Sequence, residues 1–421
     1  MTTHDSMTRR NYLRWLSTTT LSAPFLGSAA VRATDAVVSG PPKKVAAVVT
    51  AYHSSLHADV ILGKILEGWK QDGGPGPNLT LATMYIDQTS PSDLGHVMAA
   101  KHNVRLFNTI EGALTAETDG IAVEGVLSIG EHGNYPTNEK QQCLYPRRRF
   151  FEEIVATFEK YDQVVPVFSD KHLGPVWSDA IWMYEKARAM KIPFMAGSSL
   201  PVSSRTPDLA IPMNSQIEAI VGVGYSGLDS YGFHALDLLQ SFVERRQGGE
   251  TGVRWVQCLQ GDAIWHAVDS GQVRKELLDA VLEAIPTIPN VDMRDLIGDQ
   301  VALFLFEYKD GLLGCQFMLA GFAELTGVAV QLRGGSRPLA TRIDEPRPHL
   351  EHFTYLVHAI ERMFHTGRPT YPVERTLLSS GILDRALTSR VEGYRRIDTP
   401  ELNIVYKPVD YPHAYNPSFQ G

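Results

Sequence analysis

The fold of this chain is decided by the stretch Val164-Val-Pro-Val-Phe-Ser-Asp-Lys-His-Leu173, an apolar, β-branched run that ends in an acid, a base and an imidazole. A continuous apolar run between polar residues predicts a strand buried on both faces, as in the middle of a parallel sheet. Apolar residues then recur at helical spacing from Trp177 to Met190, so a helix is expected next. Ligands bind beyond the carboxyl ends of the strands in such sheets. The pattern therefore predicts a site that contains Asp170, Lys171 and His172, the alternative being an ordinary solvated turn.

The same pattern occurs twice more in the first half of the chain. A buried strand is predicted over Lys44–Thr50, followed by a helix over about 58–70, and another strand over Asp119–Gly130. In a parallel sheet the carboxyl ends of the strands face the same way, and neighbouring strands are about 4.8 Å apart. We therefore expect the polar residues after these three strands to form one cluster. Its predicted members are His53, His57, Glu131, His132, Asp170, Lys171 and His172.

Length and composition favour a globular protein of two domains. The 421 residues, 43% of them hydrophobic, exceed the size at which single cores stop growing. A net charge of -8 argues against a nucleic-acid partner, which needs a basic face. The three cysteines, Cys143, Cys258 and Cys315, are far apart and indicate buried free thiols rather than a disulfide framework or a thiolate metal site. No membrane span is predicted after the N-terminal segment.

Residues 1–33 resemble a twin-arginine export signal. The paired Arg9-Arg10 precedes Tyr12-Leu13, a mildly apolar stretch from Trp15 to Val31, and the exit Val31-Arg-Ala33. The resemblance implies export in the folded state by the twin-arginine machinery, often after insertion of a cofactor, and a periplasmic or otherwise exported location. The alternative is a disordered tail. We expect a linker over residues 34–43, which contains Pro41-Pro42.

Residues 44–200 are predicted to form the first domain. The strand Leu79–Ile86 ends at Asp87, where dinucleotide-binding folds place the acid that hydrogen-bonds the adenosine ribose. Further helices and strands alternate: a helix over Ser92–His102, a short strand over Val104–Phe107 and a helix over Ile110–Leu114. This alternation predicts βαβ units and a right-handed, Rossmann-like, doubly wound parallel sheet, which makes the fold class α/β.

This order of elements resembles the nucleotide-binding half of the Gfo/Idh/MocA family, which groups glucose-fructose oxidoreductase and inositol dehydrogenase. The features that carry the resemblance are the acid after the second strand, Asp119-Gly120 before an apolar strand, and Ser169-Asp-Lys-His172 in the place of the Glu-Lys-Pro that ends the family's fifth strand. The resemblance covers nearly all of the chain after residue 33. It implies an oxidoreductase that acts on a sugar or sugar derivative and, taken together with the export signal, one that keeps its NAD(P) tightly bound.

The resemblance also implies roles for individual residues. Lys171 matches the family's substrate-site lysine. Cofactor binding is expected at Tyr52, His53, Asp87, Glu131 and Asp170, and substrate binding at His132, His172 and Tyr231.

The loop after the first strand departs from the family pattern. Family members carry Gly-x-Gly-x-x-Gly there, because glycines allow backbone amides to approach the pyrophosphate. Here the loop reads Thr50-Ala-Tyr-His-Ser-Ser-Leu-His57, without a glycine. Either the dinucleotide is held differently or the cofactor site has been reused. The basic triplet Arg147-Arg-Arg149 nearby is either a solvated helix start or a receptor for an anionic substrate.

A second domain over residues 201–408 is expected to carry the catalytic histidine. From Phe194 the pattern changes to strands of antiparallel type, and Gly224–Leu239 resembles the family's substrate-domain segment, Asp-x-Gly-x-His-x-x-Asp on a helix. His234 matches the catalytic histidine and Asp237 the acid one turn later. The family's preceding acid lies four residues before the histidine, whereas here Asp229 lies five before, so it serves only if the backbone bulges. The alternative is a buried histidine satisfied by Asp237.

The rest of this domain is predicted to be an open, mostly antiparallel sheet whose helices lie on one face. The predicted strands are Ile217–Val223, Val253–Gln260, Gln300–Tyr308, Leu312–Leu319, Val328–Arg333 and Glu401–Tyr406, with a hairpin at Lys309-Asp-Gly311. The predicted helices are Pro348–Thr366 and Val373–Gly393. Residues 409–421 are expected to form an extended tail.

Three functions follow from these observations. The first is the sugar oxidoreductase, with His234 as general acid/base, supported by Asp229 and Asp237, and with Lys171 orienting a substrate hydroxyl and lowering its pKa. The second is a lyase or hydrolase without a dinucleotide, in which a divalent metal is held among His53, His57, His132 and His172. The third is a carbohydrate-binding protein without chemistry. A small-molecule carbohydrate is the expected partner in each case, and a homo-oligomer is compatible with all three.

Overall fold

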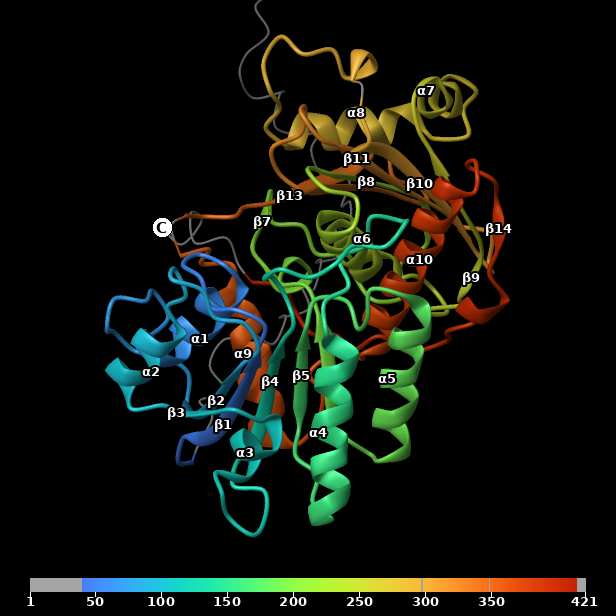
Figure 1. Cartoon of the computed structure of the whole chain (residues 1–421). Helices are drawn as coiled ribbons and strands as arrows, with labels where there is room; N and C mark the ends of the chain where they lie inside the picture. Colours follow the sequence, from blue (N-terminus) through green and yellow to red (C-terminus); the bar gives the residue numbers. More distant parts are fainter. Residues whose placement is uncertain (1–39, 297, 348, 415–421) are drawn as a thin grey trace, which may run out of the picture. The chain divides into compact units, whose positions relative to one another are not determined.

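The first half of the chain forms a six-stranded sheet in which every strand is parallel to its neighbours (Figure 1). The computed structural model describes residues 40–296, 298–347 and 349–414, so the predicted export signal lies outside the described residues. The strand order is β3-β2-β1-β4-β5-β6, which is the doubly wound order predicted. The strands are β1 (Lys43–Val49), β2 (Leu79–Ile86), β3 (Arg105–Phe107), β4 (Gly125–Ile129), β5 (Val167–Asp170) and β6 (Phe194–Gly197).

Helices cover both faces of this sheet because its central strands are apolar on both sides. In β1, Val45, Ala47 and Val49 pack against one layer of helices, and Ala46 and Val48 against the other. The first layer holds α1 (His57–Glu67), α2 (Gly95–His102) and α9 (Phe353–Thr366). The second holds α3 (Ile110–Thr115), α4 (Arg147–Tyr161) and α5 (Trp177–Ala189).

The second half of the chain forms an eight-stranded sheet in the order β14-β9-β10-β11-β8-β12-β13-β7. Only the pair β11 and β8 is parallel, so the predicted mostly antiparallel sheet is confirmed. The strands are β7 (Arg205–Thr206), β8 (Ile217–Gly224), β9 (Val253–Leu259), β10 (Val301–Tyr308), β11 (Leu313–Leu319), β12 (Gly327–Leu332), β13 (Leu339–Ile343) and β14 (Ile397–Asp398).

The helices of the second sheet lie on both of its faces, which corrects the expectation of one covered face. Residues of α6 (Ser230–Val243) and α10 (Glu374–Val391) pack with Phe304 of β10 in one core cluster. Residues of α7 (Asp262–Asp269) and α8 (Lys275–Ala284) pack with Leu303 and Leu305 of the same strand in another (Figure 1). Every residue of β10 except Glu307 is buried, so both faces of the strand are covered, and a sheet of that kind needs two covering layers.

Three predicted strands differ from the structure. Residues from Phe194 do not begin the antiparallel region, because β6 pairs with β5 in parallel. The strand predicted over 119–130 is limited to β4, since its pairing with β1 begins only at Val45–Gly125. Residues 401–406 are not a strand: a 3-10 helix covers Pro400–Leu402, where proline lacks the N–H that a strand ladder needs, and β14 joins the sheet instead.

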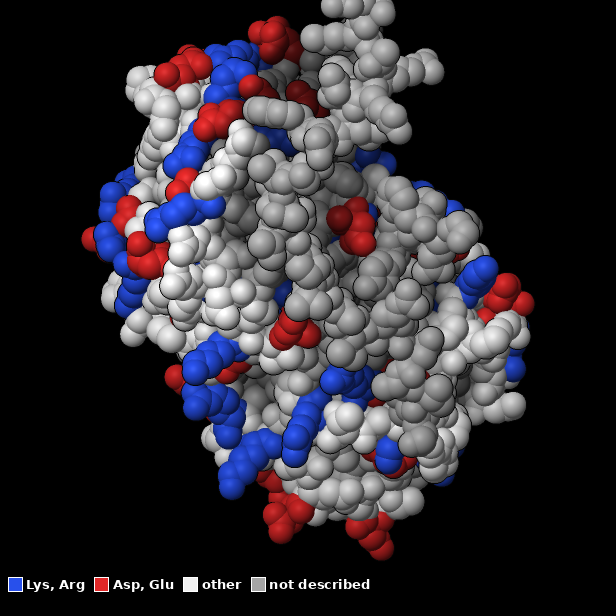
Figure 2. All heavy atoms as spheres, turned by 180° about the vertical axis from the view of Figure 1, so that it is seen from behind, with Lys and Arg blue, Asp and Glu red and all other residues white. Residues whose placement is uncertain are grey.

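The described residues belong to one compact unit, Val37–Gly421, that contains both sheets. The described part of the predicted tail, up to residue 414, has no helix or strand, and its Ala414 donates a backbone hydrogen bond to Val202. Among the described helices, none combines the length and the hydropathy that a membrane span requires. Acidic and basic side chains lie beside one another over the described part of the face shown in Figure 2.

Candidate active site

Polar residues from the ends of β1, β4 and β5 meet in one group, here called the tip cluster: His57, Glu131, His132, Asp170, Lys171 and His172. His57 Nδ1 lies 2.6 Å from Asp170 Oδ2, and Lys171 Nζ lies 2.9 Å from Glu131 Oε1. The ring centroids of His57 and His132 are 5.5 Å apart. The predicted convergence of the three strand ends is therefore confirmed, since these residues come from segments far apart in the sequence.

Two residues of the tip cluster have left-handed backbone conformations. His132 has φ of 70° and Lys171 has φ of 64°. Residues other than glycine rarely adopt this conformation, and those that do are concentrated at functional sites. These two residues come just after β4 and β5, so the backbone changes direction at the points where the polar side chains of the tip cluster begin.

A buried ion network holds the cluster together. Glu131 accepts hydrogen bonds from Arg147 and pairs with Lys171, and all three side chains are almost completely buried. Burial alone raises the pKa of Glu131, but the charges of Lys171 and Arg147 outweigh it and hold the pKa well below its usual value. Arg147 also lies 3.1 Å from His172 Nε2, and Lys171 donates to the carbonyl of Ser230. The first arginine of the predicted basic triplet is thus a partner of Glu131.

His234 lies in the first part of α6 and joins the cluster from the second half of the chain. Its ring is stacked on that of His57 with centroids 5.8 Å apart, and Tyr231 lies 6.2 Å away. Its Nδ1 lies 2.6 Å from Ser198 Oγ. Asp237, one turn further, accepts hydrogen bonds from the backbone N–H of Ser198 and from the Ser379 hydroxyl, and among the described residues neither of these bonds involves the His234 ring. The sequence did not single out Ser198, although it directly follows β6 and so lies at a strand end like the others.

Three imidazoles of the site, those of His132, His172 and His234, are neutral at neutral pH. Burial lowers the pKa of His132 to about 4, with the neighbouring His57 adding to the shift. Burial also holds the pKa values of His172 and His234 well below their usual value, with Arg147 or Lys171 adding to the shift. Burial lowers the pKa of His352, before α9, to about 3. Neutral imidazoles offer one donor and one acceptor each, which suits hydroxyl groups.

The tip cluster is not sealed from solution. The side chain of His57 is 12% exposed, and Tyr231 is 37% exposed. The Tyr231 ring packs against Tyr225, whose hydroxyl donates to Glu345.

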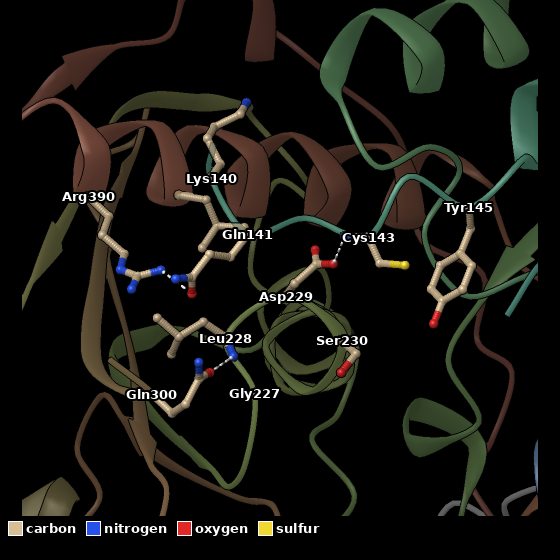
Figure 3. A pocket seen from close by; sticks show the side chains of 11 residues that line it. Lys140, Gln141, Cys143, Tyr145, Gly227, Leu228, Asp229, Ser230, Gln300 and Arg390 are labelled. Atoms are coloured by element: carbon tan, nitrogen blue, oxygen red, sulfur yellow. Dashed lines mark hydrogen bonds between the residues drawn. The ribbon is translucent and has the colours of Figure 1, made fainter. Parts of the chain in front are cut away.

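A cavity of about 250 Å³ adjoins the cluster at the N-terminus of α6 (Figure 3). Its polar lining includes Lys140, Gln141, Asp229, Ser230, Gln300 and Arg390. Asp229 faces the cavity; its Oδ2 accepts a hydrogen bond from the N–H of Cys143, and its Oδ1 is buried without a partner among the described residues. Burial raises the pKa of Asp229 to about 6. Asp229 thus lies beside the cavity and not next to His234. This agrees with its position five residues before His234, where the family has an acid four residues before.

Two predicted cofactor residues after β1 do not face the tip cluster. The side chain of Tyr52 is fully buried in the core of the first sheet. His53 is part-exposed, and its Nδ1 lies 3.3 Å from the carbonyl of Ser92. His53 is therefore separate from the other predicted metal ligands.

The loop after β1 does not fit a pyrophosphate. Its amide groups at Tyr52 and Ser55 already donate to the carboxylates of Asp93 and Asp59, both at 2.8 Å. A phosphate at these amides would meet two negative charges, whereas dinucleotide sites present free N–H groups and a helix N-terminus to the anion. The loop after β2 is also bonded directly to this loop, with Leu94 N–H donating to the Tyr52 carbonyl at 2.7 Å.

The acid after β2 does not fit an adenosine ribose. The carboxylate of Asp87 accepts hydrogen bonds from the hydroxyls of Tyr85 and Tyr135, each at 2.7 Å, and from Arg149. Although burial alone raises the pKa of Asp87, these bonds lower it. The carboxylate of Asp170 is likewise taken by His57. The described residues therefore do not fit a dinucleotide bound in the manner that the resemblance implies.

The side chains also give no support for a metal site. Within residues 40–296, 298–347 and 349–414, no group of three or more His, Cys, Asp and Glu side chains is arranged to hold a metal ion. His57 and His172, two of the predicted ligands, point their bonded nitrogens to Asp170 and Arg147.

No family model matches the chain, and no curated protein matches it in sequence. Solved structures share its fold. GenD2 from gentamicin A biosynthesis, in complex with NAD, has a TM-score of 0.55 and 13% identity over 85% of this chain and 97% of that chain. The apo scyllo-inositol dehydrogenase of Lactobacillus casei has a TM-score of 0.54 and 9% identity, over 85% of this chain and 98% of that chain. The myo-inositol dehydrogenase of the same organism, in complex with NAD(H) and myo-inositol, has a TM-score of 0.53 and 9% identity, over 85% of this chain and 96% of that chain.

These identities show a shared fold. The predicted Rossmann-like sheet followed by a mostly antiparallel sheet is confirmed, and the neighbours include inositol dehydrogenases of the kind that the sequence resemblance pointed to.

Proposed function

We propose that this protein is a carbohydrate-processing enzyme that works by acid–base chemistry without a dinucleotide. The fold is shared with dehydrogenases of polyols, and the imidazoles of His57, His132 and His234 can form hydrogen bonds with the hydroxyl groups of such a substrate. The polar cavity beside Asp229 and Ser230 gives room for the part of the substrate that does not react.

The observation that carries the non-redox reaction is the loop after β1. Its amides are bonded to Asp93 and Asp59, so the chain's own carboxylates take the hydrogen-bond donors that a pyrophosphate needs. Without a hydride acceptor, the groups at the tip cluster can move protons but not hydride. A lyase, which breaks a carbon–oxygen bond after removal of a carbon-bound proton, is the class that such a site serves.

An assay for bound dinucleotide tests whether the reaction is non-redox. The protein is purified without residues 1–33 and denatured, and the supernatant is assayed for nicotinamide dinucleotide; the native protein is titrated with NADH and NADPH by fluorescence. We expect no nucleotide in the supernatant and no saturable binding. Stoichiometric nucleotide, or binding in the micromolar range, would contradict the proposal.

The second candidate is the sugar oxidoreductase predicted from the sequence. The observation that favours it is the fold shared with the NAD-bound GenD2 structure and with the NAD(H)-bound inositol dehydrogenase. As an exported enzyme it would keep NAD(P) tightly bound, and the contacts of Asp93 and Asp59 with the loop would have to open. The nucleotide assay above separates the two candidates.

The chemistry can be separated from simple binding with one probe. Saturation-transfer NMR with myo-inositol reports whether the protein binds a polyol. Binding without any turnover of carbohydrate substrates would support the third predicted class, a carbohydrate-binding protein, and would contradict the enzyme proposal.

Export by the twin-arginine route remains part of this proposal. It is supported by the Arg9-Arg10 pair and the apolar stretch after it, which lie outside the described residues. Residues 1–33 fused to a reporter that requires folded export should direct it to the periplasm, and Arg9→Lys/Arg10→Lys should retain it in the cytoplasm.

A further inference from the structure

His57 is held in one tautomer by a buried carboxylate. Asp170 is 1% exposed, and its Oδ2 lies 2.6 Å from His57 Nδ1. A carboxylate only accepts hydrogen bonds, so His57 carries a proton on Nδ1. The other nitrogen, Nε2, has no hydrogen-bond partner in the part of the chain that the structure describes. When the imidazole carries the Nδ1 proton alone, Nε2 is its proton acceptor.

The orientation of the His57 ring is fixed from two sides. His57 is the first residue of α1, and its ring meets the edge of Phe353 at 5.1 Å with an interplanar angle of 83°. The ring of His234 is also stacked on it, with centroids 5.8 Å apart. A ring held by packing and by a carboxylate loses little freedom when it takes part in a reaction.

His234 is held in the opposite tautomer. Ser198 Oγ accepts a hydrogen bond from the N–H of Leu200 at 3.1 Å and lies 2.6 Å from His234 Nδ1. We assign the Ser198 O–H as the donor to His234 Nδ1, because this is the one acceptor that it meets among the described residues. An Nδ1 that accepts a hydrogen bond carries no proton, so the proton of His234 lies on Nε2. His234 is therefore a hydrogen-bond donor where His57 is an acceptor.

We propose that His57 is the general base of this site, oriented by Asp170, and that His234 is the donor that stabilises the negative charge developing on a substrate carbonyl oxygen. The inference rests on the proposed non-redox function and names its catalytic residues. It assigns the proton transfer to His57 rather than to His234, and it makes a carbohydrate that carries a carbonyl group the substrate class.

The reaction balances with one imidazole acting twice. The C–H bond next to the carbonyl breaks, its proton goes to His57 Nε2, and its electron pair forms an enolate whose oxygen accepts from His234 Nε2–H. The enolate electrons then form a carbon–carbon double bond while the bond from the β-carbon to its oxygen breaks. The His57 imidazolium returns the proton to that leaving oxygen. The positive charge exists only beside the Asp170 carboxylate, which stabilises it.

The tautomers can be read directly by two-dimensional ¹⁵N–¹H NMR of labelled protein, without any reaction. We expect a protonated Nδ1 and an unprotonated Nε2 for His57, and the reverse for His234. In Asp170→Asn the His57 signals should shift to a mixture of tautomers, because an amide also donates hydrogen bonds. The same tautomer on both histidines would overturn the inference whatever the enzyme does.

Deuterium uptake tests the base. The probe is 2-keto-myo-inositol in D₂O, with ¹H NMR following the loss of the C–H signals beside the ketone. We expect uptake catalysed by the wild-type protein and a fall of about 100-fold or more in His57→Asn. His102→Gln is the matched control, since His102 also pairs with a carboxylate, that of Glu67 at 3.3 Å, but lies on α2 away from the tip cluster. This control should retain the wild-type rate.

The outcomes separate the inference from the function on which it rests. Uptake that persists in a folded His57→Asn would overturn the general-base role and leave the non-redox function standing. Absence of uptake in the wild-type protein, despite the expected tautomers, would overturn the non-redox function and the role of His57 with it.

Discussion

The charge of Glu131 is the residue-scale feature on which the tip cluster depends. Its carboxylate is buried between Lys171 and Arg147, two cations that lie equally deep. Removing one partner of a buried ion network is costly because the remaining charges stay desolvated without compensation. The stability of the site is therefore concentrated in one side chain.

We expect Glu131→Gln to lower the free energy of unfolding by about 3–5 kcal/mol, since two buried cations lose their counter-charge. Glu124→Gln is the control; Glu124 pairs with Lys43 at 2.6 Å on the surface, and exposed pairs contribute less than about 1 kcal/mol. Urea unfolding of both variants measures the difference. Equal losses would show that the tip cluster is not a buried ion network.

Asp237 predicts a pH effect at the same scale. Burial raises its pKa from 3.8 to about 6 in the folded protein. The folded state therefore binds more protons than the unfolded state between these values, so Asp237 makes stability fall as pH rises from about 4 to about 6.

The variant Asp237→Asn should not lose stability in this way as the pH rises, because its amide does not ionise. The stability of the variant relative to wild type should rise by about 2–3 kcal/mol between pH 4 and pH 6 and stay constant above pH 6. The exposed Asp262→Asn should show no such change. Urea unfolding at several pH values checks the sign, and a difference that falls with rising pH would contradict the raised pKa.

At the scale of elements, the end of β6 is built around a close approach. Gly197 has φ of 131°, and a Cβ there would lie 2.8 Å from Thr376 Oγ1 of α10 and 2.9 Å from Asp237 Oδ2 of α6. Three elements meet at this glycine. The position of Ser198, which bonds to His234, depends on that approach.

Gly197→Ala should therefore cost about 1–3 kcal/mol more than Gly271→Ala, because overlap adds to the backbone strain. Gly271 also has a positive φ, of 80°, but a Cβ there would meet nothing within 4 Å. Thermal and urea unfolding compare the two variants. A similar cost for both would mean that α6 and α10 move apart without penalty.

At the scale of the whole molecule, the six-stranded sheet is completed by a helix from the far end of the sequence. The helix α9 packs beside α1 in the core of this sheet, with Phe353, Leu356, Val357, Ala359, Ile360, Met363 and Phe364 buried. The residues predicted as the first domain, 44–200, do not include it. The predicted domain boundaries remain a prediction. Because α9 completes the core of the first sheet, they can be tested by asking whether the first part of the chain folds without this helix.

A fragment of residues 40–204 should not fold cooperatively. Each large apolar side chain lost from the core removes about 1.5–3 kcal/mol, and the sum exceeds the 5–15 kcal/mol by which proteins are usually stable. Circular dichroism and dye binding to exposed apolar surface measure this, with the chain from residue 40 to 414 as control. A sharp unfolding transition in the fragment would show that α9 is dispensable.

Predictions from sequence succeeded where a property is written along the chain. Apolar runs such as Val45–Val49 fixed the buried strands, and the order of strands and helices fixed the parallel sheet and the edge at which His57, Glu131 and Lys171 meet. Burial of a strand and the direction of its carboxyl end follow from local periodicity and connection rules, so no distant contact is needed to derive them.

Only the tertiary structure decided which of these side chains bond to each other. His57 and Asp170 are 113 positions apart, and Asp93 takes the Tyr52 amide from 41 positions away, so nothing in either segment announces the partner. Hydrogen bonds act over about 3 Å, and the pairing therefore depends on the final placement of every element between the partners. For the same reason the sequence predicted a histidine-rich strand edge, and only the structure decided that His57 bonds to Asp170 and His234 to Ser198.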